Sequence, residues 1–311
     1  VRPFAGESWA VLTLPVAVAV VLIGLAHLLL SRRDFAAGIL PDRAGRPVGR
    51  IASASGLAWR QQRGMLLAWT AVYAVAGAFF GALVAAVRNA PAAIGDSPVL
   101  RGFLDRYAGA GGASGPDVFL WVIALTLGYT AALYPALVVA RVRAEEAGGR
   151  AELLLSTPAT RVAWAGSHAI IAALGTVVLL AAGGLTTGLA FAGGSGGEGS
   201  PLPALAATLL QAPAAWVLGG VTLLTLGLVP RATAAVAWAG FLFVQLFELV
   251  GPLAGIDFRI VEWVVPYFHL PRILTGDAPT PWPVLALAAV TLALGSIGIA
   301  ALSRRDLAPT S

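Results

Sequence analysis

The sequence lacks two residue types that carry much enzyme chemistry: among its 311 residues there is no cysteine and no lysine, so all 20 basic side chains are arginine. Without lysine, the chain cannot form a phosphate-binding loop of the G-x-x-x-x-G-K-[ST] type or a Schiff base. Without cysteine, it has no disulfide, thiol nucleophile or thiolate metal ligand. The three histidines are far apart and form no ligand motif. We therefore predict no catalytic residue, cofactor site or metal site in this chain.

Charge is also scarce. Only 11% of the residues are charged, whereas 58% are hydrophobic, and the mean hydropathy is +0.84. Several apolar runs exceed the roughly 20 residues that a helix needs to cross about 30 Å of hydrocarbon. The short alternating strands of a membrane barrel are absent from the sequence. This pattern predicts an all-α integral membrane protein, a polytopic helical bundle of about seven transmembrane helices.

The apolar runs give the limits of these helices. The seven predicted spans are 9–30, 65–87, 118–140, 164–192, 203–229, 233–254 and 283–302. Tryptophans near span ends are typical of anchors at the membrane interface. We predict this anchoring role for Trp9, Trp59, Trp121, Trp164 and Trp282.

The loops on the two sides of the spans differ in charge. Loops 31–64, 141–163 and 230–232 and the tail from 303 carry 14 arginines and six acids, whereas the other loops carry six arginines and eight acids. The positive-inside rule places the arginine-rich loops and the C-terminus in the cytoplasm of a multi-pass plasma-membrane protein. The same rule accounts for the basic patches, so we predict no nucleic-acid partner.

The first and last spans end in the same pattern. LSRRDF closes the first span at 30–35, and LSRRDL closes the last at 302–307. Both spans are predicted to run toward the same face. We therefore expect a duplicated unit, in which 1–35 is the last helix of a first repeat, 36–64 is a cytoplasmic linker with an elbow helix, and 65–311 is a six-helix domain. On this interpretation the chain is a fragment of a longer protein.

One cytoplasmic segment between spans is rich in charge. Residues 141–163 read RVRAEEAGGRAELLLSTPATRVA. Glu146 and Arg150 are four residues apart in the order that stabilises a helix. Thr157 followed by Pro158 predicts the cap and first position of the next helix. The segment thus predicts a short helix-turn-helix, with an ordinary solvated loop as the alternative.

A second segment lies before the second span. SASGLAWRQQRG, at 53–64, places Trp59 beside Arg60 and Arg63. An aromatic side chain among arginines is typical of a helix that lies flat at the membrane surface. This predicts an elbow helix, either with no further role or with a docking role.

Several of these stretches resemble a known family. The run RVRAEEAGGRAELLLSTPATRVAWAGSH, the pre-span RQQRG, and PYFHLPRILTGDAPTPWPVLALAAV followed by SRRDL resemble permease subunits of ABC-2-type exporters. More narrowly, they are similar to the duplicated actinobacterial permeases of tetronasin or polyketide-antibiotic exporters, which are associated with multidrug efflux and antibiotic resistance. The most specific part is EE-x-x-GR-x-E-LLL-x-TP-x-x-R-x-x-W.

The resemblance implies a permease of an ATP-binding-cassette exporter that moves a hydrophobic or amphipathic compound, such as a drug, an antibiotic or a lipid-like molecule, out of the cell. The chain is then a transport subunit and not an enzyme, and ATP and Mg bind to a separate soluble ATPase, expected to be a homodimer. The other partners are the lipid bilayer and a first permease repeat in the same or another chain. The residues implied to form the helix that couples to the ATPase are Glu145, Glu146, Gly149, Arg150, Glu152 and Arg161.

Within the bundle, aromatic and polar side chains are predicted to line a translocation path. These residues are Phe79, Phe80, Tyr129, Tyr134, Gln245 and Glu248. Glu248 is the only acid inside a predicted span, and a charge at bilayer depth is a functional candidate by default. It therefore keeps open a proton-coupled secondary transporter. A membrane-embedded lipid-modifying enzyme is a weaker alternative, because the acids between 145 and 152 are interleaved with arginine and lack metal-ligand spacing.

The outer segment 255–282 mixes charged and apolar residues. Its sequence IDFRIVEWVVPYFHLP predicts a short amphipathic helix at the outer interface. The resemblance implies a gate-like helix pair at this position, and a plain surface loop is the alternative.

Overall fold

The computed structural model describes residues 53–89, 115–197, 199–250 and 263–305, together with helical positions between 16 and 28. It divides into two units, Val1–Arg50 and Ile51–Ser311. In the first unit, the described positions are helical and exposed. Most of the first predicted span and all of the linker up to residue 52 lie outside the described residues, so the division into repeats remains a prediction.

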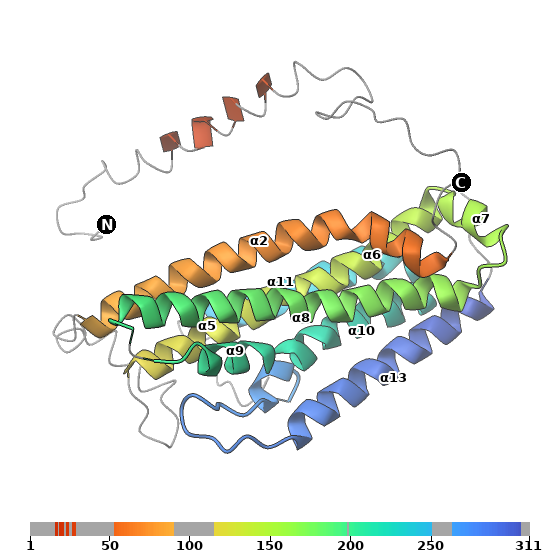
Figure 1. Ribbon diagram of the computed structural model, residues 1–311. Coiled ribbons are helices and arrows are strands. Elements are labelled where there is room, and N and C mark those ends of the chain that lie inside the picture. Colours follow the sequence, from red (N-terminus) through yellow and green to blue (C-terminus); the bar gives the residue numbers. More distant parts are fainter. Residues whose placement is uncertain are drawn as a thin grey trace. The chain divides into compact units, whose positions relative to one another are not determined.

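The second unit is a bundle of membrane-length helices. Six helices or joined helix pairs are long and apolar enough to cross a membrane, and the described ranges contain no strand. These are α2 (Ala54–Asn89), α5 with α6 (Gly115–Ala131 and Leu133–Ala147), α8 (Arg161–Gly194), α9 with α10 (Leu202–Leu209 and Ala212–Leu228), η1 with α11 (Pro230–Ala232 and Thr233–Val250), and α13 (Trp282–Arg304). They coincide with the last six predicted spans, which confirms the all-α polytopic fold (Figure 1).

Two predicted spans are interrupted rather than continuous. The α5–α6 break follows Ala131 and the α9–α10 break follows Leu209. In each case the last residue of the helix lies four residues before a proline, Pro135 or Pro213. A proline has no N–H for the carbonyl four residues earlier, and its ring clashes with that carbonyl, so the helix breaks there. A hydropathy profile alone does not detect such a break in a helix.

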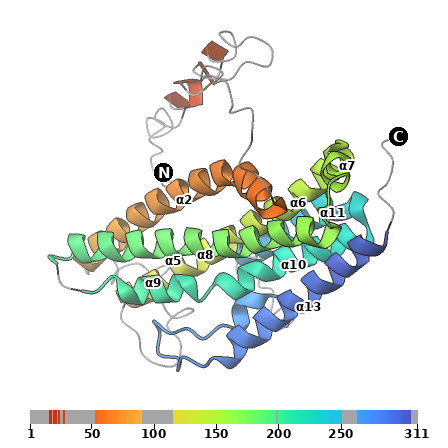
Figure 2. The same ribbon diagram turned by 45° about the vertical axis from the view of Figure 1, so that its right-hand side comes forward.

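Glycines let the longest helices approach closely. α2 and α8 run side by side along most of their length (Figures 1 and 2). A Cβ on Gly77 would lie 2.2 Å from the Gly183 carbonyl oxygen, and one on Gly81 would lie 2.1 Å from that of Thr187. This Gly-x-x-x-Gly pair therefore brings the two backbones into contact, as small residues do between membrane helices.

The described part of the outer segment packs against the bundle through Val265, Tyr267 and Leu270, whereas Trp263 and Val264 are exposed. Residues 251–262 lie outside the described residues, and the remainder forms the short helix η2 (Pro266–His269) with buried Tyr267. The Tyr267 hydroxyl donates to the Gly128 carbonyl at 2.8 Å, and its ring lies 4.5 Å from that of Tyr129. Burial raises the pKa of Tyr267 well above its ordinary value, so the hydroxyl stays a donor. Hydrogen bonding and aromatic packing thus hold Tyr267 inside, whereas the charged residues of the predicted amphipathic helix, between 257 and 262, lie outside the described residues, so that helix remains a prediction.

Candidate functional site

The charged segment forms the predicted helix-turn-helix. α6 ends at Ala147, and α7 (Arg150–Leu155) begins after Gly149, whose φ of 70° is a left-handed conformation that glycine adopts without strain. The Arg150 guanidinium donates to the Ala144 carbonyl at 3.4 Å across this turn. α7 lies at the end of the bundle where α2 and α8 begin and α13 ends (Figure 2). We call this the α7 end.

Glu146 joins the α6–α7 turn to the end of α13. Arg305 Nη1 donates to Glu146 Oε1 at 2.7 Å and Arg305 Nη2 to Oε2 at 2.8 Å. The Glu146 side chain is 1% exposed, and Arg143 Nη1 lies 3.4 Å from its Oε2. A planar guanidinium paired with both oxygens of a carboxylate fixes orientation as well as distance. Glu146 therefore pairs with Arg143 and Arg305, instead of with Arg150 as its spacing predicted.

Glu145 points to other partners. Trp164 Nε1 donates to Glu145 Oε2 at 3.2 Å, and His168 Nε2 lies 3.9 Å from the same oxygen. On the other side of the imidazole, the amide Nε2 of Gln62 lies 3.2 Å from His168 Nδ1. These two atoms are hydrogen-bonded, and the imidazole tautomer sets which of them donates. A chain of polar contacts thus runs from α6 through α8 to α2.

We call this set the polar knot, and it comprises Gln62, Glu145, Glu146, Trp164, His168 and Arg305. It also holds the backbone that follows α13, because Arg161 donates to the Arg305 carbonyl and Arg305 Nη2 donates to the Leu226 carbonyl of α10 at 3.4 Å. Five helices therefore meet in one network. A buried charge is costly unless it is paired and hydrogen-bonded. Glu146 meets both conditions through Arg143 and Arg305, and Glu145 accepts a hydrogen bond from Trp164 beside His168.

Apolar packing supports the knot from within the bundle. The side chains that pack together here are Val139, Val142, Ala151, Trp164, Ala165, Leu223, Leu226 and Leu302, with Leu154, Ala169 and Ile299 at the margin. Ala151 and Leu154 belong to α7, so one face of this short helix is seated on the bundle. Its other face carries the exposed residues Arg150 and Glu152.

The structure divides the predicted coupling residues into two groups. Arg150 and Glu152 are exposed, whereas Glu145 and Glu146 are buried at 5% and 4% exposure. Buried carboxylates cannot bind a protein surface in this conformation. They connect the turn to α8 and α13 instead, and their part in coupling remains a prediction. Arg161 is half-buried and bonds to the chain after α13.

The cap before α8 also differs from the prediction. Thr160, not Thr157, is the N-cap, and its Oγ1 accepts from Ala163 N at 3.1 Å. The Thr157 hydroxyl instead donates to the Leu154 carbonyl at 2.5 Å and closes the end of α7. The predicted cap, Thr157, therefore serves the turn after Leu155 instead.

The predicted elbow residues lie in the first turns of α2. Trp59 is 51% exposed, and Arg60 and Arg63 are exposed. The elbow and the second span form one continuous helix, whose first turns bend away from the rest (Figures 1 and 2). Gln62, between the two arginines, is fully buried against His168.

The predicted translocation residues do not share one surface. Phe79 is 65% exposed, and its ring lies 5.5 Å from that of Phe80. Tyr129 and Tyr134 are buried in the core, 6% and 0% exposed. Gln245 is partly exposed on α11, and Glu248 is on the same helix, with its side chain outside the described residues. A shared path through these residues remains a prediction.

Four residues of the polar knot were missed or read differently from the sequence. Trp164 was expected at the membrane interface but is 1% exposed, because its indole N–H binds Glu145. No local sequence motif marks His168 or Gln62 as members of this network. Arg305 could have been singled out from the sequence, because it belongs to the SRRD pattern that occurs twice in the chain. In the ranges that the structure covers, no three His, Asp or Glu side chains are grouped as metal ligands would be.

Comparison with known proteins gives two matches. The family model described as "Multidrug efflux system permease Rv1217c, C-terminal domain" matches residues 51–302. The chain is also 37% identical over 311 residues to the multidrug efflux system permease protein Rv1217c of Mycobacterium tuberculosis. This alignment covers 99% of the chain and 55% of that relative, so the chain spans about half the length of the protein that it matches.

Proposed function

Because this chain belongs to the multidrug efflux permease family defined by that C-terminal domain, we propose that it is the membrane-spanning transport part of an ATP-binding-cassette exporter. It moves a hydrophobic or amphipathic compound, such as a drug, an antibiotic or a lipid-like molecule, out of the cell. ATP hydrolysis, with its Mg, takes place on a separate soluble ATPase, a homodimer. A first permease repeat, in the same or another chain, completes the membrane part.

The observation that carries this proposal is the polar knot. It connects the end of α6, which leads into α7, to the starts of α2 and α8 and the ends of α10 and α13 through hydrogen bonds and a bidentate ion pair. A subunit that presses on α7 therefore acts on these helices through the turn to α6 and through the packing of Ala151 and Leu154 on the bundle. Such a connection is what an ATP-driven permease needs in order to turn closure of an ATPase dimer into rearrangement of its spans.

The contact surface for the ATPase is the outward face of α7 and its two turns. Arg150 and Glu152 are exposed there, and Ser156, Thr157 and Pro158 continue the surface. The inward face is occupied by Ala151 and the apolar cluster below it. Glu145, Glu146 and Arg161 act from behind this surface as positioning residues.

The orientation follows from charge. The arginine-rich loops 141–163 and 230–232, the first turns of α2 and the end of α13 lie together at the α7 end, as the contacts of the polar knot require. The positive-inside rule places this end in the cytoplasm, where ATP and its ATPase are found.

ATP-driven export in inverted membrane vesicles tests the proposal. Charge reversal on the exposed face, Arg150→Glu with Glu152→Arg, is expected to weaken ATPase recruitment and to lower ATP-dependent uptake of a hydrophobic fluorescent drug by at least tenfold. Arg304→Glu is the matched control, because Arg304 is an exposed arginine at the same end but outside α7. Uptake that does not depend on ATP, or that follows an imposed proton gradient, contradicts the proposal.

A further inference from the structure

The first turns of α2 carry two arginines that the polar knot does not use. Arg60 and Arg63 are exposed, and neither forms a hydrogen bond or an ion pair with any residue that the structure describes. By contrast, Arg143 and Arg305 hold Glu146, and Arg150 donates to a backbone carbonyl. α2 contains no acidic residue, so nothing within the helix neutralises the two charges.

The packing of α2 turns both arginines outward. Residues three apart lie on one side of a helix, so the two guanidiniums share a face. The opposite face is buried, with Ala58 at 1% and Gln62 at 0% exposure, and the Gln62 amide is hydrogen-bonded to His168. A rotation that turned the arginines inward would break this contact. The arginine pair is therefore fixed on the outer surface of the bundle.

The same face continues into the membrane part of α2. Leu67 and Ala71 follow Arg63 by one and two turns, and both are exposed, Leu67 by 69%. They belong to a helix with the length and composition of a membrane span, so they face hydrocarbon. Trp59, 51% exposed, lies one turn before Arg63, and tryptophan prefers the head-group level. The face thus has charge at the membrane surface and apolar side chains below it.

This arrangement selects an anionic phospholipid. A guanidinium binds a phosphate through charge-assisted hydrogen bonds, and long arginine side chains reach the head groups while their stems lie along apolar surface. A zwitterionic head group brings a cation of its own, which two arginines repel. A soluble protein could meet the arginines, but it could not follow Leu67 and Ala71 into hydrocarbon.

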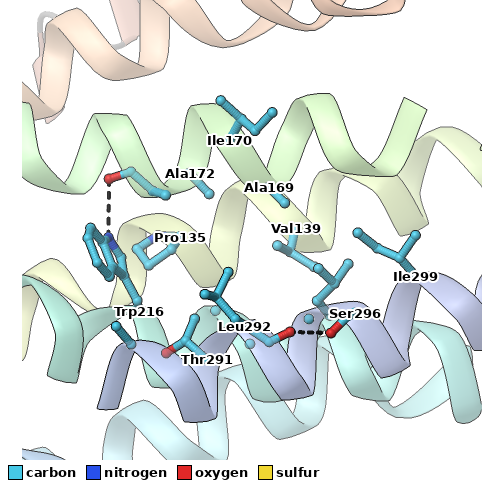
Figure 3. Close-up of a pocket in the computed structure, with 16 residues that line it drawn as sticks. Pro135, Val139, Ala169, Ile170, Ala172, Trp216, Thr291, Leu292, Ser296 and Ile299 are labelled. Carbon is cyan, nitrogen blue, oxygen red and sulfur yellow. Dashed lines mark hydrogen bonds between the residues drawn. The ribbon is translucent and has the colours of Figure 1, made fainter. Parts of the chain in front are cut away.

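The groove between α8 and α13 provides a comparison within the same chain (Figure 3). Ile170 and Leu292 border it and are 62% and 72% exposed, so acyl chains reach it. None of the described residues that line it is charged, and the Trp216 N–H already donates to the Ala173 carbonyl at 3.1 Å. This groove therefore has no means of distinguishing an anionic head group from a zwitterionic one.

We propose that the face of α2 formed by Trp59, Arg60, Arg63 and Leu67 binds an anionic phospholipid. The phosphate lies on the two guanidiniums, and an acyl chain runs along Leu67 and Ala71. This lipid stays in the bilayer and is not the exported compound. Its binding requires neither the ATPase nor transport, so the inference is independent of the proposed function.

The test compares two photoactivatable lipids in phosphatidylcholine nanodiscs that contain the full chain. Phosphatidylglycerol and phosphatidylcholine probes carry the same diazirine on the same acyl chain, and peptide mass spectrometry locates the label. One arginine near an anionic head group is worth about fivefold in binding, so two predict a preference of about 25-fold. The phosphatidylglycerol probe is therefore expected to label 64–75 at least tenfold more strongly than the phosphatidylcholine probe, whereas both label 288–292, beside the groove, equally.

Three variants identify the arginine pair as the site. Arg60→Gln with Arg63→Gln is expected to lower the preference at 64–75 to that at 288–292. Arg60→Lys with Arg63→Lys keeps both charges and is expected to retain most of the preference. Arg304→Gln is the matched control, because Arg304 is an exposed arginine at the same end but on another helix, and it leaves the preference unchanged. Thermal unfolding checks that each variant is folded.

Three results would overturn the inference. The first is equal labelling of 64–75 by the two probes in the native protein. The second is a folded glutamine variant that keeps the native preference; if that variant also fails to recruit the ATPase, the arginines belong to the ATPase contact. The third is loss of the preference when inorganic phosphate is added at constant ionic strength, which would make the pair a site for free phosphate.

Discussion

Adjacent glutamates in α6 have different roles. Successive residues of an α-helix are rotated by about 100° from one another. The Glu145 carboxylate therefore contacts Trp164 and His168 of α8, whereas that of Glu146 contacts Arg305 after α13. One turn of α6 thus holds two neighbouring helices, and both connections start within five residues of α7.

At this scale, Trp164 gives a direct test of the knot. Trp164→Phe keeps an aromatic ring but removes the N–H that binds Glu145, which leaves a buried carboxylate short of a donor. The expected loss is about 1–3 kcal/mol of unfolding free energy. Thermal unfolding in detergent measures it, with Trp282→Phe as control, because Trp282 is 75% exposed. Equal destabilisation by the two changes would show that the hydrogen bond contributes nothing.

The sequence could identify the charged segment but not the direction of its side chains. Helix spacing allowed Glu146 to pair with Arg150, and only the folded chain brings Arg305 within 2.7 Å of it, from 159 residues away. The same limit applies to Gln62 and His168, which lie 106 residues apart. Local rules describe neighbours on one helix, whereas these contacts depend on how four helices are placed.

At the scale of the element, small residues set the distance between helices. Gly77 and Gly81 face Gly183 and Thr187 without a side chain between the backbones. Membrane helices gain little from burying apolar surface away from lipid, so close van der Waals packing carries much of their association. The contact between α2 and α8 therefore depends on these positions.

Gly81→Leu is expected to separate α2 from α8, because even its Cβ would lie 2.1 Å from the Thr187 carbonyl oxygen. Overpacking of this kind costs about 1–3 kcal/mol or more. Size-exclusion profiles and melting temperatures in detergent report the damage. Gly64→Leu is the matched control on the same helix, where a Cβ has open space. A variant as stable as this control would rule out close packing at Gly81.

The limits of the described helices show what hydropathy can predict. Six spans were placed correctly, because about 20 apolar residues in sequence are enough to identify each one. The breaks before Pro135 and Pro213 were missed although the prolines are visible, since prolines are tolerated within membrane helices. The buried position of η2 could not be predicted, because it depends on the Gly128 carbonyl in another helix.

At the scale of the whole molecule, orientation can be measured directly. The chain has no cysteine, so a single introduced thiol needs no background removal. Ser156→Cys, in the turn after α7, is expected to react with a membrane-impermeant maleimide only after cells are permeabilised. Ser200→Cys, at the opposite end, is expected to react in intact cells. Both residues are exposed, and the reverse pattern would invert the proposed topology.

The central claim is that the polar knot transmits movement of α7 to the membrane helices. The most direct measurement is the amount of drug exported per ATP hydrolysed by the reconstituted permease and ATPase, for Glu146→Arg, Arg305→Glu and the two together. Each single change leaves a like-charged pair, so export per ATP is expected to fall by at least tenfold while ATPase binding persists. The double change restores an opposite-charge pair and is expected to recover part of the export. Folded single variants that export as much drug per ATP as the native protein would contradict the claim.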